Sequence, residues 1–307
     1  MRTESANYDE NGKITIKEKE IGDVGPGELL VEGGICGICS WDIATCRSGK
    51  KMEVPAPPGH EAVGFVKEMG PGVKGFEVGD IVAGGGFSSL RKIPALASRK
   101  IPKTSLSLEH WLAEPVTCVV NGIDHCSVKP GDRIVMIGTG FMGLLMLQGL
   151  KKSPADTIIA VDIDDAKLAR AKEFGADEVY NRSCAHLAET LAAMEIDTVI
   201  ETSGSKSGLE LAGIIVKKGG TINLFGWLKQ TVEFNFSNWH MKGLTVINAS
   251  PSAAKRELYI PAIRLIANGV FDTSALITHR VPLHSYPELM KTIIAGDATY
   301  MKGIVAL

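Results

Sequence analysis

The sequence has little cysteine, little excess charge of either sign, and no long apolar run. Six cysteines in 307 residues do not indicate a disulfide scaffold and favour reduced thiols in the cytoplasm. A formal net charge of −2, without a long basic run, gives no support for binding nucleic acid or an anionic membrane. No apolar run reaches the roughly 18 residues of a membrane-spanning helix. The polar start MRTESANYDENGK is unlike a signal peptide, so we expect a cytoplasmic protein with no membrane partner.

The chain has two regions with different patterns of apolar and turn-forming residues. Up to about residue 115, short apolar runs alternate with glycine and proline turns, which predicts a small β-barrel. From residue 116, apolar strands alternate with helices, which predicts an α/β domain with a doubly wound parallel sheet. The C-terminal segment is expected to return to the first region. The predicted domains are therefore 1–115 with 256–307, and 116–255.

The strongest motif lies in the stretch from Asp132 to Asp162, DRIVMIGTGFMGLLMLQGLKKSPADTIIAVD. A strand, G-x-G-x-x-G, a helix, a second strand and a terminal acid follow one another, as in a dinucleotide-binding βαβ unit. The helix N-terminus would face the pyrophosphate, and Asp162 would accept a ribose 2′-hydroxyl but repel a 2′-phosphate, which favours NAD. A glycine-rich turn without a nucleotide is the alternative. The predicted NAD-binding residues are Gly138, Gly140, Phe141, Met142, Gly143, Asp162 and Lys167, although Lys167 could equally lie on a solvated helix face.

Three short segments of the first region carry thiol, imidazole and carboxylate groups: GICGICSWD, GHE and LAEP. This combination suits Zn²⁺, and ligands scattered along the chain are typical of a catalytic site. Each residue alone has an ordinary explanation. Cys36 and Cys39 could form a redox pair or half of a structural zinc site, His60 could be a hydrogen-bonding loop residue, and Glu114 a helix-end carboxylate.

The chain resembles the zinc-dependent medium-chain dehydrogenase/reductase (alcohol dehydrogenase) family, in its sorbitol (polyol) and threonine dehydrogenase-like branch. The resemblance extends over essentially the whole chain. It rests on GICGICSWD, GHEAVGFV, GPGVKGFEVGD, LAEPV, GDRIVMIGTGFMG, AVDIDDAK and ITHRVPL. It implies a GroES-like β-barrel catalytic domain and a Rossmann NAD-binding domain, with cofactor and substrate in the cleft between them. It also implies a homodimer or homotetramer.

The resemblance assigns the metal ligands residue by residue. Cys39 and His60 match the cysteine and the histidine that bind catalytic zinc in the family, and either Glu61 or Glu114 supplies the third protein ligand. The implied activity is reversible oxidation of a secondary alcohol, such as a polyol, cyclitol or sugar-like compound, to its ketone with NAD. Two alternatives stay open. One is a metal-free NAD(P)H-dependent carbonyl or enone reductase, and the other is a non-catalytic NAD-binding protein.

Further residues either match the family pattern or depart from it. Asp42 matches an aspartate that orients the ligand histidine, and Lys302 matches a basic residue that can meet Glu61. The stretch GGGFSSLRKIPALASRK lacks the four cysteines of a structural-zinc lobe, so we expect one catalytic zinc and no structural zinc. Trp41 and Ala44 stand where a proton-relay hydroxyl and a histidine are usual. We therefore expect an altered relay and a pocket narrowed by Trp41.

Overall fold

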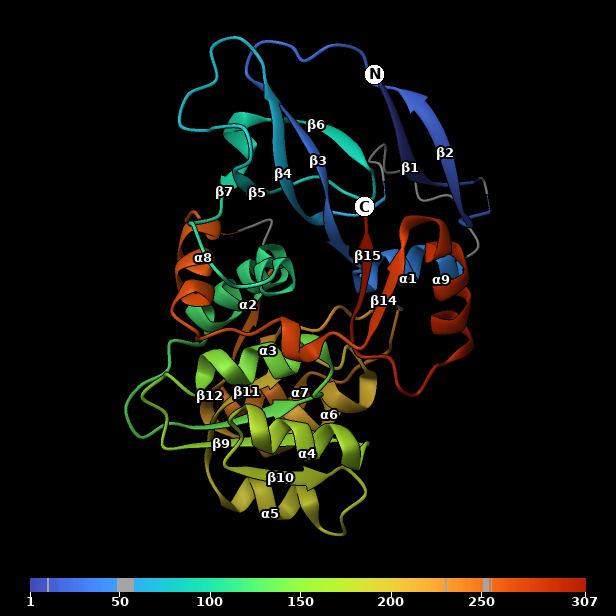
Figure 1. Ribbon diagram of the computed structural model, residues 1–307. Helices are drawn as coiled ribbons and strands as arrows, with labels where there is room; N and C mark the ends of the chain where they lie inside the picture. The colour runs from blue at the N-terminus through green and yellow to red at the C-terminus, as the bar shows by residue number, and fades with distance from the viewer. Residues whose placement is uncertain (10, 49–57, 230, 251–253, 255) are drawn as a thin grey trace. The chain divides into compact units, whose positions relative to one another are not determined.

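The computed structural model describes residues 1–9, 11–48, 58–229, 231–250, 254 and 256–307 (Figure 1). These residues divide into two units: Met1–Pro115 with Asp272–Leu307, and Val116–Phe271. The first boundary coincides with the predicted one.

The second boundary differs from the predicted one, because residues 256–271 belong to the second unit and not to the first. This segment contains α8 (Tyr259–Ala267). Arg256 forms an ion pair with Asp124 of α2 (Ala113–Cys126), with 2.5 Å between Nη2 and Oδ2. The Phe271 ring lies so close to Gly149 that a Cβ at that glycine would stand 2.9 Å from Cζ. The second unit therefore extends 16 residues further along the chain than expected. The reason is these tertiary contacts, which the sequence pattern does not reveal.

The first unit is built around β3 (Glu28–Gly37), which pairs antiparallel with β4 (Glu61–Met69) and with β15 (Gly303–Ala306). The strand order is β14-β15-β3-β4-β5-β7, and β6 also pairs with β3. The remaining strands are β5 (Ile81–Ala83), β6 (Leu90–Pro94), β7 (Arg99–Lys100) and β14 (His279–Pro282). The last strand of the chain therefore completes the sheet that the first hundred residues begin.

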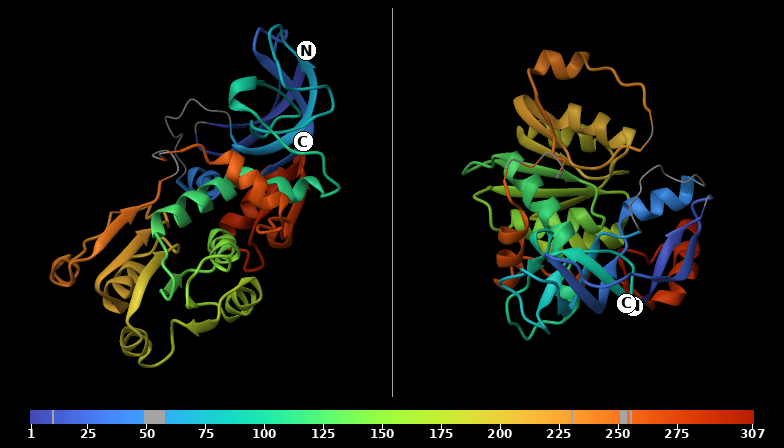
Figure 2. Two further views of the ribbon diagram at one scale, coloured as in Figure 1. Left: turned by 90° about the vertical axis from the view of Figure 1, so that its left-hand side faces the viewer. Right: turned by 90° about the horizontal axis from the view of Figure 1, so that it is seen from above.

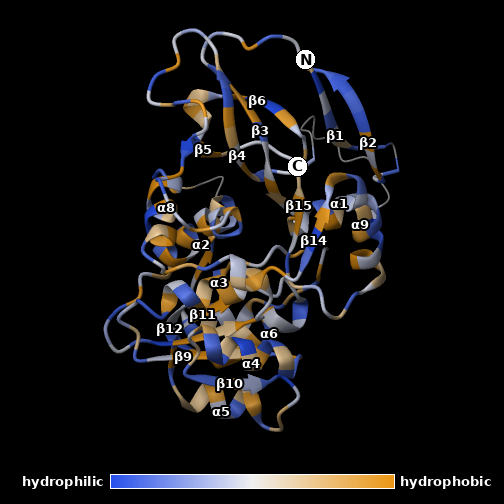
Figure 3. Ribbon diagram, viewed as in Figure 1, coloured by the Kyte–Doolittle hydropathy of each residue, from blue (hydrophilic) through white to orange (hydrophobic). Residues whose placement is uncertain are grey.

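Helices and a hairpin cover this sheet. The hairpin consists of β1 (Arg2–Tyr8) and β2 (Ile14–Glu20), and β2, mostly blue in Figure 3, buries only Ile14. The helices are α1 (Ser40–Ser48) and α9 (Tyr286–Ala295), with short 3₁₀ turns η1 (Ala95–Ala97), η2 (Leu108–Trp111), η4 (Ser274–Leu276) and η5 (Leu283–Ser285). Buried side chains from β3, β4, α9 and the hairpin form one apolar cluster, which holds the end of β3 in place.

The stretch 84–100, which lacks the cysteines of a structural-zinc lobe, is held by a buried arginine. Arg91 of β6 donates to the carbonyl oxygens of Gly33 at 3.0 Å, Gly84 at 3.2 Å and Ser88 at 3.3 Å. One guanidinium thus satisfies a carbonyl group of β3 and two of the segment between β5 and β6.

The second unit is a six-stranded parallel sheet in the order β10-β9-β8-β11-β12-β13. Its strands are β8 (Arg133–Ile137), β9 (Thr157–Asp162), β10 (Glu178–Asn181), β11 (Ile196–Glu201), β12 (Val216–Leu224) and β13 (Thr245–Asn248). The central strands β8 and β9 contain continuous runs of buried isoleucine, valine, methionine and alanine, as parallel strands covered on both faces require.

The connections of this sheet run in two opposite directions from β8. β8, α3 (Phe141–Leu150), β9, α4 (Asp165–Phe174) and β10 move one way, whereas α5 (Leu187–Ala193) leads back to β11, α6 (Lys206–Ile215) and β12. Right-handed crossovers in opposite directions put the helices on opposite faces, and the loops after the neighbouring parallel strands β8 and β11 lie at the same edge of the sheet. The chain then leaves β12 and returns at β13 through α7 (Ser237–Lys242), in orange in Figure 2. None of the helices in the described ranges combines the length and hydrophobicity that crossing a membrane requires.

Candidate functional site

The first candidate site lies where β3 ends and β4 begins. The antiparallel register pairs Gly37 with Glu61, so the chain that continues to Cys39 passes beside His60, the residue before Glu61. The Cys39 sulfur, a His60 ring nitrogen and a Glu61 carboxylate oxygen all lie within 4.8 Å of one another. Thiolate, imidazole and carboxylate are the ligand types that zinc takes in catalytic sites, so this donor set fits the ion.

Gly37 makes room for this arrangement. A Cβ at this position would stand 2.1 Å from Oε2 of Glu61 and 3.2 Å from Cε of Lys302. Any side chain here would push the carboxylate away from Cys39. The glycine between the two cysteines of CGIC is therefore needed for close approach of β3 to the Glu61 side chain.

Asp42, in the first turn of α1, is completely buried and connects two segments. Its Oδ2 accepts the backbone N–H of Cys39 at 2.9 Å, and its Oδ1 accepts the hydroxyl of Tyr8 at 2.8 Å. Burial raises the pKa of Asp42, whereas these two hydrogen bonds and then the nearby His60 lower it. The structure thus shows Asp42 fixing the backbone at Cys39, a contact different from the histidine-orienting role that the resemblance implies.

The Cys39 thiol is a poor acid in this environment. Burial, and then the nearby Glu61 carboxylate, raise the pKa of Cys39 to about 12, against the opposing effect of Lys302. Without a bound cation the sulfur is therefore protonated at neutral pH. A divalent ion that binds here must displace that proton.

Glu61 is paired with a buried lysine. Nζ of Lys302 lies 2.5 Å from Oε2 of Glu61, and the two side chains are 3% and 2% exposed. The same Nζ donates to the Ile38 carbonyl at 2.9 Å. Burial lowers the pKa of Lys302, but Glu61 and then Cys39 more than reverse this, and the net pKa is raised. The lysine therefore stays charged and compensates the Glu61 carboxylate beside the candidate metal ligands.

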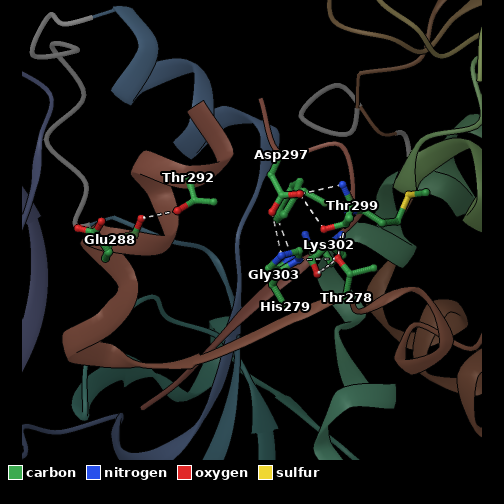
Figure 4. A network of polar contacts seen from close by, with 10 residues as sticks. Thr278, His279, Glu288, Thr292, Asp297, Thr299, Lys302 and Gly303 are labelled. Carbon is green, nitrogen blue, oxygen red and sulfur yellow. Dashed lines mark hydrogen bonds and ion pairs between the residues drawn. The ribbon is translucent and has the colours of Figure 1, made fainter. Parts of the chain in front are cut away.

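A polar network around β14 holds the backbone at Lys302 (Figure 4). The Lys302 carbonyl accepts the backbone N–H groups of Thr278 at 2.9 Å and His279 at 3.1 Å. The Thr278 hydroxyl is 2.8 Å from Nδ1 of His279, whose Nε2 is 3.1 Å from Oδ2 of Asp297. Asp297 in turn accepts the backbone N–H and the hydroxyl of Thr299. These contacts close the turn before β15 and so direct the Lys302 side chain toward Glu61.

Replacing Lys302 by methionine is expected to destabilise the protein by about 3–5 kcal/mol, because Glu61 would remain buried without its counter-charge. Urea unfolding measures the loss. The matched control is Lys291→Met, which breaks an exposed pair with Glu288 (2.8 Å, 74% and 73% exposed) and should change the unfolding free energy by no more than about 0.5 kcal/mol. Equal effects of the two substitutions would contradict the assigned role of Lys302.

Glu114 is not a member of the group of ligand atoms that Cys39, His60 and Glu61 form. Glu114 lies in the first turn of α2. Among the described residues, the group of ligand atoms within 4.8 Å of one another consists of Cys39, His60 and Glu61 and does not include Glu114.

The second candidate site is the loop between β8 and α3. Gly138 has a φ of +97°, and a Cβ there would stand 2.8 Å from the backbone nitrogen of Ser203. A Cβ at Gly143 would stand 2.3 Å from the Gly138 carbonyl oxygen, so only glycine lets α3 pack this closely on the loop. Gly140 is the N-cap of α3, so the helix begins directly after the second glycine of the motif, and the N–H end of its macrodipole points toward the loop. This end of α3 can therefore receive a pyrophosphate.

Two threonines hold this loop from either side. The Thr202 hydroxyl, after β11, donates to the Gly138 carbonyl at 2.6 Å. Thr139 donates its backbone N–H at 2.6 Å and its hydroxyl at 2.9 Å to Oδ2 of Asp162. Lys167 lies in the first turn of α4, with its Nζ 3.8 Å from Oδ2 of Asp164.

Sequence reasoning missed Tyr8 and Thr139 as members of these sites. Tyr8 lies 34 positions from its partner Asp42, and nothing in the local pattern of β1 distinguishes it. For Thr139 a signal did exist. It occupies a variable position of the G-x-G-x-x-G motif, and a hydroxyl there can reach the acid that follows the second strand.

Comparison with known proteins gives the family. The model of the alcohol dehydrogenase GroES-like domain matches residues 25–102, and that of the zinc-binding dehydrogenases matches 142–268. The sorbitol dehydrogenase of Halalkalibacterium halodurans is 25% identical over 94% of this chain and 94% of its own length.

Two solved structures share the whole fold. A zinc-binding dehydrogenase from Sinorhizobium meliloti, bound to NADP, has a TM-score of 0.87 at 23% identity and covers 100% of both chains. An alcohol dehydrogenase from Escherichia coli, complexed with NADH, has a TM-score of 0.86 at 24% identity over 100% of this chain and 99% of its own. The predicted fold class, a GroES-like domain with a parallel-sheet Rossmann domain, is confirmed. The chain belongs to the zinc-type medium-chain alcohol dehydrogenase family of oxidoreductases, in its polyol dehydrogenase branch.

Proposed function

We propose that this protein interconverts a secondary alcohol and its ketone with NAD(H) at one zinc ion per chain, and that it acts in the cytoplasm. The observation that carries the proposal is the convergence of Cys39, His60 and Glu61 in a chain that also has a dinucleotide-binding unit. The sorbitol dehydrogenase relative supports a polyol, cyclitol or sugar-like substrate.

The chain's own residues prepare the metal site. Asp42 fixes the backbone at Cys39, and Tyr8 fixes Asp42. Lys302 compensates the charge of the Glu61 carboxylate by forming an ion pair with it. When bound, zinc would polarise the alcohol oxygen as a Lewis acid, and NAD would accept the hydride. Trp41, in α1 beside Cys39, would narrow the space left for the substrate.

Removing the Cys39 thiol tests the metal site directly. Cys39→Ser should weaken zinc binding by roughly a hundredfold or more, because the softest ligand is lost, and should abolish turnover. Competition with a chromogenic chelator measures the affinity. Cys184→Ser, at an exposed cysteine, is the control and should bind zinc like the unmodified protein. Glu61→Gln and Glu114→Gln, measured alongside, show which carboxylate is the third ligand. Full turnover of the Cys39 variant would favour a metal-free reductase.

Zinc affinity should rise with pH between about pH 7 and 9. In this window the free Cys39 is a protonated thiol, because its pKa is about 12, so binding releases a proton and each unit of pH increases the affinity about tenfold. The chelator competition, repeated at several pH values, measures this slope. The slope should become shallower in the Cys39→Ser variant, and equal slopes would show that the sulfur is not a ligand.

The same proposal includes a homodimer formed through β13, the edge strand of the parallel sheet. Val246 on this strand and the neighbouring Phe236 and Met241 are exposed apolar side chains, and an exposed apolar edge favours pairing with another strand. Val246→Lys should shift the protein to monomers at micromolar concentration in light scattering. Ile260→Lys, at an exposed residue of α8, is the control. A monomeric unmodified protein would refute this interface.

A further inference from the structure

The Asp162 carboxylate, at the end of β9, is surrounded by four donors of the protein itself. Oδ2 accepts the backbone N–H of Thr139 at 2.6 Å and its hydroxyl at 2.9 Å. Oδ1 accepts the backbone N–H groups of Ile163 at 2.8 Å and Asp164 at 3.1 Å. A carboxylate has about four lone-pair positions. Each of them therefore already faces a donor before any ligand arrives.

Three of these four donors cannot move aside. The Thr139 N–H lies between Gly138, whose carbonyl is held by the Thr202 hydroxyl, and Gly140, the N-cap of α3. The N–H groups of Ile163 and Asp164 belong to the turn that Asp162 itself closes before α4. The Thr139 hydroxyl is the exception, because its O–H can turn about the Cβ–Oγ bond.

Thr139 is completely buried, whereas Asp162 is partly exposed. A ligand can therefore reach Asp162 but not the threonine oxygen behind it. A ribose hydroxyl that donates to Asp162 approaches from the exposed side and must share a carboxylate that the Thr139 hydroxyl already engages.

We propose that Thr139 is a specificity-determining residue, whose hydroxyl competes with the ribose 2′-hydroxyl of NAD for Asp162. This inference rests on the proposed dinucleotide function. The competition concerns NAD alone, because the 2′-phosphate of NADP is an acceptor and gains nothing from a free lone pair on a carboxylate. Toward NADP, Asp162 acts by charge repulsion, to which the neighbouring carboxylates of Asp164 and Asp165 add.

The selectivity for NAD is accordingly lower than Asp162 alone would produce. Asp162 uses part of its hydrogen-bonding capacity to hold the glycine loop to β9. The identity of the residue between the first two glycines of the motif thus sets how strongly the acid favours NAD.

The test is Thr139→Val, which keeps the branched shape of the buried side chain and replaces the hydroxyl by a methyl group. Dissociation constants for NAD and NADP are measured by quenching of tryptophan fluorescence or by calorimetry. NAD should bind about three- to tenfold more tightly, the worth of one hydrogen bond, and NADP should change less than about twofold. Thr139→Ser retains the hydroxyl and should behave like the unmodified protein. Thr139→Ala removes the same hydroxyl and replaces the valine variant if that variant fails to fold.

The possible results separate this inference from the proposed function. An unmodified protein that binds neither dinucleotide, or prefers NADP, overturns the proposed use of NAD and this inference with it. If the unmodified protein prefers NAD, an unchanged or weaker NAD affinity in Thr139→Val overturns this inference alone. Equal weakening of NAD and NADP would show that Thr139 only supports the shape of the loop. A gain for NAD alone is the result that we expect.

Discussion

The pairing of β3 with β4 on one side and with β15 on the other is the constraint on which the candidate metal site depends. It brings together residues from three distant parts of the chain: Cys39 after β3, His60 and Glu61 at the start of β4, and Lys302 before β15. A shift of this register by one residue would turn each side chain to the other face of the sheet. The C-terminal strand is thus as necessary to the site as the cysteine and the histidine.

The buried charges at this site balance one another. Glu61 lies beside a thiol and an imidazole, and Lys302 supplies the cation that makes its burial tolerable. A buried pair of this kind contributes little net stability compared with apolar residues, but loss of one partner is costly. The network of Thr278, His279 and Asp297 holds the lysine backbone, so that the pairing does not depend on the long, flexible side chain alone.

The fold of the second unit, unlike the metal site, follows largely from its local sequence pattern. Its strands are buried on both faces and are joined by helices, so the local pattern already implies the parallel sheet. The close approaches at Gly138 and Gly143 explain why the motif needs glycine at these places. What the motif leaves open is the residue between its first two glycines. Thr139, which occupies this position, donates two hydrogen bonds to an acid 23 residues away.

The sequence by itself determined the two kinds of domain, the parallel sheet, the glycine loop and the segments that hold Cys39, His60 and Glu61. These follow from local periodicity and short motifs, in which each residue's neighbours along the chain carry the information. Only the tertiary structure decided that residues 256–271 belong to the second unit, that Glu114 lies outside the cluster of ligand atoms, and that Tyr8 and Thr139 hold the two acids Asp42 and Asp162. These features depend on packing and hydrogen bonds between residues far apart in the chain, for which no local pattern exists.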